Sequence, residues 1–110
     1  MEITEEQIPL EGFLLVAAIL FALGIYGVLS RRNAVQILMS VELMLNAVAI
    51  NFVAFGTYTD PEFFRGLIFG IFVIIIAAAE VGLALGIILR VFRNQPRAAG
   101  NVDEIDQLKW

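Results

Sequence analysis

The chain has 110 residues, of which 60% are apolar and only 16% are charged, and its formal net charge is −4. A soluble domain is about 45–50% apolar and about 25% charged, and a small domain keeps much of its surface in water. The absence of Cys and His excludes disulfides, a thiol nucleophile and metal or haem sites built on those residues. The few basic residues argue against nucleic-acid binding. We therefore expect one domain, residues 1–110, with lipid around much of it.

Charged residues divide the chain into three apolar segments, each near the ~20 residues that a membrane-spanning helix needs. The first helix is expected at about 10–30, the second at about 33–56, and the third at about 61–92. Continuous apolar runs do not fit the alternating pattern of a membrane barrel. The sequence thus predicts an all-α membrane protein with three transmembrane helices and a polar C-terminal tail over 93–110.

Local signals predict where the helices begin and end. Asn33 follows a short polar connection and can cap the second helix. Gly56 is typical of a residue that ends a helix. Asp60 followed by Pro61 resembles the start of the third helix, with a capping acid before a proline in the first turn.

Basic residues predict the orientation in the membrane. Arg31 and Arg32 lie between the first two helices, and Arg90, Arg93 and Arg97 follow or end the third. The N-terminal segment instead carries acids, which also argues against a signal peptide. We expect the N-terminus outside, and the first loop and the C-terminus inside.

Two glutamates lie inside the second and third spans. Glu42 is ten residues after Arg32 and Glu80 is ten residues before Arg90. Ten helical residues rise ~15 Å, half of a hydrocarbon core of ~30 Å. Both carboxyls are therefore predicted near the midplane at matching depth. A charged group there costs ~2.5–3.5 kcal/mol on insertion scales, and such residues usually mark proton or ion pathways.

Other residues fit a polar path beside these acids. Asn46 is one helical turn from Glu42 and can hydrogen-bond the carboxyl or simply hold two helices together. Arg31 and Arg32 can set topology and contact lipid headgroups, or attract protons at a pathway entrance. Asn51 points to a different side of the helix and is expected to have another partner.

Small residues on the third span predict close helix packing. Gly66 and Gly70 form one pair spaced by four residues, and Gly82 and Gly86 form a second. The second pair lies roughly opposite Glu80. The partner helix is left open by the sequence.

No nucleophile–base constellation or nucleotide-binding motif is present. We expect no catalytic residue, no cofactor and no metal on this chain itself. Two buried acids in three helices are also too little to enclose a gated pathway, so other subunits are expected.

Three segments carry a family resemblance: residues 24–35 (GIYGVLSRRNAV), 39–47 (MSVELMLNA) and 77–83 (AAAEVGL). Together they resemble the first loop and the second and third helices of the K subunit of proton-pumping NADH:quinone oxidoreductase, complex I. The resemblance runs in order from about residue 12 to residue 94.

The resemblance implies a membrane-arm subunit between a J-type and an antiporter-like N-type neighbour, in a bacterial cytoplasmic or thylakoid membrane. It implies that Glu42 and Glu80 belong to the proton-transfer axis, with Asn46, Arg31 and Arg32 in support. It places the quinone, FMN and iron–sulfur clusters in partner subunits.

Alternative functions remain at this stage. The C subunit of multisubunit sodium/proton antiporters is related but lacks acids matching Glu42 and Glu80. Small multidrug transporters have four helices with the essential Glu on the first, and rotor-ring proteolipids have two helices. A purely structural subunit, whose acids are hydrogen-bonded pegs, is the last alternative.

Overall fold

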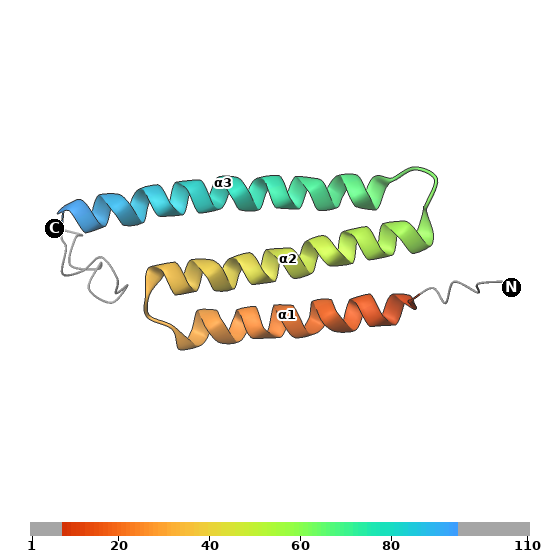
Figure 1. The fold of residues 1–110 in the computed structure, drawn as a ribbon, viewed down its shortest axis with the longest axis horizontal. Coiled ribbons are helices and arrows are strands. Elements are labelled where there is room, and N and C mark those ends of the chain that lie inside the picture. Colours follow the sequence, from red (N-terminus) through yellow and green to blue (C-terminus); the bar gives the residue numbers. More distant parts are fainter. Residues whose placement is uncertain (1–7, 95–110) are drawn as a thin grey trace, which may run out of the picture.

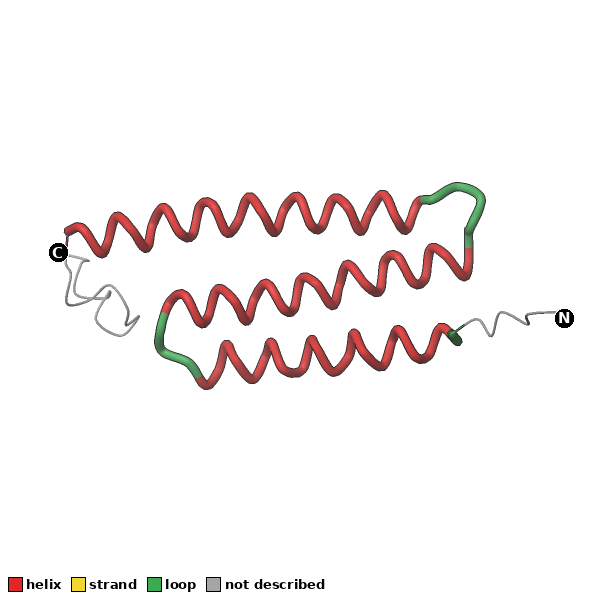
Figure 2. The backbone as a smooth tube through the Cα atoms, viewed as in Figure 1, coloured by secondary structure: helices red, strands yellow, loops and turns green. Residues whose placement is uncertain are grey.

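A computed structural model describes residues 8–94 of the chain. Three helices follow one another: α1 (Leu10–Ser30), α2 (Ala34–Thr59) and α3 (Arg65–Asn94). Figures 1 and 2 draw these three helices as the regular elements of the described residues. Each is long and apolar enough to cross a membrane. The prediction of an all-α membrane protein with three spanning helices is confirmed.

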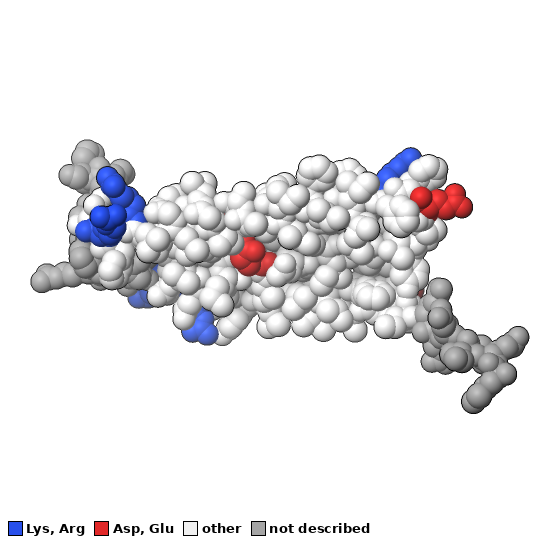
Figure 3. Space-filling model, turned by 45° about the horizontal axis from the view of Figure 1, so that its top comes forward, with Lys and Arg blue, Asp and Glu red and all other residues white. Residues whose placement is uncertain are grey.

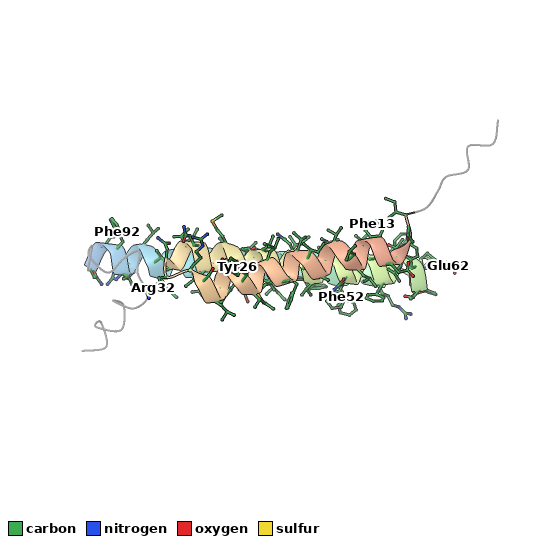
Figure 4. All side chains as sticks on the ribbon, turned by 90° about the horizontal axis from the view of Figure 1, so that it is seen from below. Phe13, Tyr26, Arg32, Phe52, Glu62 and Phe92 are labelled. Atoms are coloured by element: carbon green, nitrogen blue, oxygen red, sulfur yellow. The ribbon has the colours of Figure 1, made fainter. Side chains whose placement is uncertain are left out.

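The helix α2 lies in the middle of the molecule and packs against both α1 and α3. Two short connections reverse the chain, so neighbouring helices are antiparallel (Figure 1). In the perpendicular view of Figure 4 the helices overlap within little more than one helix width. The three helices therefore form nearly one layer, with α2 open on both faces.

The start of α2 follows the prediction. The Asn33 side chain accepts hydrogen bonds from the backbone N–H groups of Val35 and Gln36, at 2.9 and 3.4 Å. These groups have no partner within the helix, so the cap satisfies two of its free donors.

The connection between α2 and α3 differs from the prediction. Gly56 does not end α2, which continues to Thr59, and Pro61 does not begin α3, which starts at Arg65. Gly56 keeps a negative φ because it serves close packing: a Cβ there would lie 2.8 Å from the backbone N of Gly66. Asp60 follows the last turn of α2, and Pro61 lies in the turn itself. The non-glycine residue Phe64 closes this connection with φ 51°.

Small residues make the contacts between the helices. The buried residues among those described are all Ala or Gly: Ala17, Gly24, Ala47, Ala49, Ala54, Gly66, Gly70 and Ala77. Large apolar side chains point outward along all three helices. This reverses the pattern of a soluble protein and fits helices whose large side chains meet lipid or other subunits.

Basic residues gather at one end of the described structure. Arg31, Arg32, Arg90 and Arg93 belong to this end, called here the basic end, and Arg65 lies at the other. Figure 3 shows basic atoms concentrated at the left end, over α3 and the first connection. Figure 4 labels Arg32 and Phe92 at that end and Glu62 at the other. Arg97, the N-terminal acids before residue 8 and the tail beyond residue 94 lie outside the described residues.

Candidate functional site

Glu42 and Glu80 lie at the same level along α2 and α3. The contacts between these helices fix their register: Gly66 packs against Phe52 and Gly56, and Gly70 against Ala49 and Val53. Ten residues onward from Gly70 is Glu80, and ten residues back from 49–53 is 39–43, which contains Glu42. The matching depth expected from the sequence is thus reproduced by the packing.

Two grooves mark the opposite faces of the α2–α3 pair. The first, of about 520 Å³, is lined on α2 by Asn46, Ile50 and Val53 among others, and on α3 by Ile74. The second, of about 320 Å³, lies between residues 34–41 of α2 and residues 84–88 of α3. At 100° per residue, the α2 residues of the two grooves are centred roughly 140° apart around the helix. They open to different sides of the contact line.

The two glutamates have different positions relative to the contact line between α2 and α3. Glu42 precedes Ala49, which contacts Gly70, by two turns, so it lies on the contact line itself, with Asn46 one turn away toward the first groove. Glu80 precedes Ile87 by two turns and lies ~120° around α3 from Ile74, so it lies on the side of the second groove. The structure thus matches the depth of the two residues and gives them different positions around their helices.

Glu42 is partly enclosed by this chain. Its side chain is half-buried, and its Oε1 atom is buried with no hydrogen-bond partner among residues 8–94. Leaving a buried carboxyl oxygen unsatisfied is costly. Asn46, one turn away, is exposed on the same face and lines the first groove. A proton, a water molecule or a donor from another subunit can satisfy this oxygen.

Glu80 is exposed on the surface of this chain. Figure 3 shows acidic atoms midway along a surface that is otherwise uncharged between its two ends. A carboxyl exposed at this depth cannot face hydrocarbon without a large penalty. Water or another subunit must therefore border this carboxyl.

Asn51 has a second unsatisfied polar atom. Its Oδ1 is buried without a hydrogen-bond partner among the described residues, and the side chain lines a groove of about 350 Å³ with Val48, Phe52 and Phe55. The sequence predicted that Asn51 lies on a different side of α2 from Glu42, but it did not show that the Asn51 side chain is buried. An amide side chain in an apolar span was the sequence feature that could have indicated a polar contact.

Arg31 and Arg32 lie in the exposed connection before α2. Ten residues separate Arg32 from Glu42, or ~15 Å along the helix. The pair is therefore at the level of the basic end and not beside either glutamate.

The two glycine pairs of α3 have different surroundings. A Cβ on Gly66 would meet the backbone of α2, and one on Gly70 would lie 2.7 Å from Val53 Cγ2. A Cβ on Gly82 or Gly86 would have nothing within 4 Å. The predicted close packing is confirmed for Gly66 and Gly70, with α2 as the partner helix. Among residues 8–94, nothing packs on Gly82 or Gly86.

The described residues contain no group of three His, Cys, Asp or Glu side chains that could hold a metal ion. What the region from 8 to 94 offers near the middle of the spans is two carboxyls and two amides. Such groups can bind and release protons and order water molecules.

Comparison with known proteins identifies the family of the chain. Residues 12–110 match the family NADH-ubiquinone/plastoquinone oxidoreductase chain 4L. The chain is 48% identical over 104 residues to NAD(P)H-quinone oxidoreductase subunit 4L of Synechococcus sp. (strain JA-3-3Ab), covering 94% of this chain and 100% of that protein. It is 51% identical over 103 residues to NADH-quinone oxidoreductase subunit K 2 of Rhizobium etli (strain CIAT 652), covering 94% and 99%.

These matches run over nearly the whole length of both partners. The expected resemblance is confirmed, and other subunits of the complex are the partners of this chain. The chain belongs to the chain 4L (subunit K) family and is a multi-pass membrane subunit of a quinone oxidoreductase complex in a bacterial or thylakoid membrane.

Proposed function

We propose that this subunit carries part of the path that couples quinone chemistry to proton translocation, and that Glu42 and Glu80 are its proton-exchanging groups. The observation that carries the proposal is the pair of carboxyls at one level of two antiparallel spans, where charge is otherwise absent. Intramembrane acids that face protein or water commonly serve proton pathways. Neither acid has an ion-pair partner that would give it a structural role within the described chain.

Glu42 is the central group of the proposal. Its carboxyl can bind and release a proton, and its buried oxygen has no hydrogen-bond partner among the described residues. A water molecule or a donor from a neighbouring subunit, on the side of Asn46, can therefore exchange a proton with it. Asn46 can hold a water molecule near the Glu42 carboxyl, because its amide both donates and accepts hydrogen bonds.

Passage between the two carboxyls runs through water and side chains of neighbouring subunits, because the Glu42 oxygen has no hydrogen-bond partner among the described residues. We assign these neighbours as a J-type and an antiporter-like N-type subunit. The sequence resemblance supports this assignment.

Redox chemistry belongs to the partner subunits in this proposal. The quinone, FMN and iron–sulfur clusters are bound outside this chain, whose residues 8–94 offer carboxyls, amides and arginines in place of redox ligands. The names of its relatives, NAD(P)H-quinone and NADH-quinone oxidoreductase, leave two classes of electron donor.

The basic end is assigned to the inner side of the membrane, and the N-terminus to the outer side. Among residues 8–94, four arginines lie at the basic end and one lies at the other. Short loops rich in Arg and Lys remain on the inner side.

Replacement of Glu42 by Gln tests the proposal. The amide keeps the size and hydrogen-bonding capacity of the side chain but cannot release a proton. We expect normal assembly of the complex, and a fall of about tenfold or more in coupled turnover, equivalent to at least ~1.4 kcal/mol. Quinone reduction and proton uptake are measured in membrane vesicles.

The matched control is Glu62→Gln, which makes the same chemical change at an exposed residue of the second connection. It should leave both rates unchanged. Normal proton translocation by an assembled Glu42→Gln complex would favour the structural alternative, in which the side chain only forms a hydrogen bond that holds helices together.

A further inference from the structure

The groove between the basic-end halves of α2 and α3 is open along the surface of the molecule and has a volume of about 320 Å³. The lining is entirely aliphatic: Ala34, Ile37, Leu38, Val41, Ala84, Ile87 and Ile88.

Arginines flank this groove in the chain, at the basic end of the molecule. Ala34 follows Arg31 and Arg32, and Ile88 precedes Arg90 by two residues and Arg93 by five. Figure 3 shows basic atoms gathered at one end of the molecule. The described acids lie midway along the spans or at the opposite end. An anionic headgroup at this end therefore meets several positive charges and no described negative one.

The groove on the other face is not flanked by arginines in this way. It continues past Thr57 and Tyr58 into a hollow that also includes Pro61, beside Asp60 and Glu62. The nearest described cation is Arg65, which is 3.6 Å from the Asp60 carboxylate. Charge complementarity thus distinguishes two grooves that are both apolar inside.

We infer that the groove between residues 34–41 and 84–88 binds one acyl chain of an anionic phospholipid, whose phosphate lies among Arg31, Arg32, Arg90 and Arg93. Basic clusters at the inner end of membrane helices attract anionic headgroups. The aliphatic walls have no polar atom with which to select a protein side chain. This lipid site is independent of the proton-exchanging role proposed for Glu42 and Glu80.

Photolabelling of the intact complex tests the inference. The complex is purified in mild detergent and incubated with phosphatidylglycerol carrying a diazirine near the middle of one acyl chain. A phosphatidylcholine with the same labelled chain is the headgroup control. We expect phosphatidylglycerol to label peptides that contain residues 34–41 and 84–88, and phosphatidylcholine to label them much less.

Two kinds of variant refine the result. Ala84→Leu fills the groove and should reduce labelling to the phosphatidylcholine level, whereas Ala22→Leu, on the exposed side of α1, should not. Arg90→Gln combined with Arg93→Gln leaves the groove intact and should weaken phosphatidylglycerol binding by roughly fivefold for each charge removed. Arg65→Gln at the opposite end is its control, and a native gel checks that every variant assembles.

Equal labelling by the two lipids would overturn the inference, because the headgroup would then play no part. Labelling unchanged by Ala84→Leu would also overturn it. So would absence of lipid label together with cross-links from residues 84–88 to another subunit, since a protein helix would then cover the groove.

Discussion

Glu42 and Glu80 place the same chemical group at one depth in different surroundings. On α2, Glu42 is half-buried, has an enclosed carboxyl oxygen, and has Asn46 one turn away. On α3, Glu80 is exposed on this chain, on the side of the aliphatic groove at the basic end. Matching depth therefore does not mean matching surroundings.

The comparison indicates how two acids at one depth can respond differently to neighbouring subunits. Glu42 is partly enclosed by this chain, whereas Glu80 is exposed on it. Fewer other groups can replace the function of Glu42, which this chain itself encloses, than can replace that of Glu80, which other subunits must cover. This difference predicts unequal effects of the same substitution at the two positions.

The largest effect is expected when the contact line itself is disrupted. A Cβ at Gly66 would lie 2.9 Å from the backbone N of Gly56 and would also meet Phe52 O, and backbone atoms cannot rotate away. Gly66→Ala should therefore leave little assembled complex, as measured by native gel of solubilised membranes. Gly82→Ala is the matched change on the same helix, where a Cβ has open space within the chain, and should preserve more of the complex. Full assembly of Gly66→Ala would show that the α2–α3 contact is not needed.

Glu80→Gln is expected to reduce coupled turnover less than Glu42→Gln does. Because Glu80 is exposed on this chain, water and partner side chains can provide other routes past it. Proton uptake and quinone reduction are compared in vesicles that contain equal amounts of complex. A larger loss for Glu80→Gln than for Glu42→Gln would reverse the proposed ranking.

A smaller effect is expected at the basic end. Arg31 and Arg32 are exposed and lie ~15 Å along the helix from the level of Glu42, so either single Ala replacement should change turnover little. The double replacement should lower it about twofold, since screened surface charges contribute modestly. Turnover is measured at low and high salt, and the defect should be larger at low salt. Normal assembly and pumping by the double variant would limit these residues to topology or lipid contact.

Much of the fold could be predicted from charge spacing alone. Long uncharged runs placed all three helices, and Asn33 marked the start of α2 because its side chain suits a helix cap. The second connection was misplaced at Gly56 and Pro61, since the same residue types that end and begin helices also serve close packing and turns. Single-sequence patterns do not distinguish these uses.

The candidate site could likewise be predicted from the sequence only in part. The depth of Glu42 and Glu80 followed from counting residues to Arg32 and Arg90. Their positions relative to the α2–α3 contact line required the register of the two helices, which glycine contacts at Gly66 and Gly70 determine. The glycines at 82 and 86 have the same spacing but no contact in the described chain, so spacing indicated an interface without identifying its partner.

Moving the carboxyl of Glu42 tests most directly the claim that it acts on its own face. In a Glu42→Gln background, Asn46→Glu places an acid one turn along the same face, and Val41→Glu places one at nearly the same depth on the face of the second groove. Proton translocation by assembled complexes is measured in vesicles. Our account predicts partial recovery with Asn46→Glu and none with Val41→Glu. Equal recovery by both, or recovery only with Val41→Glu, would contradict it.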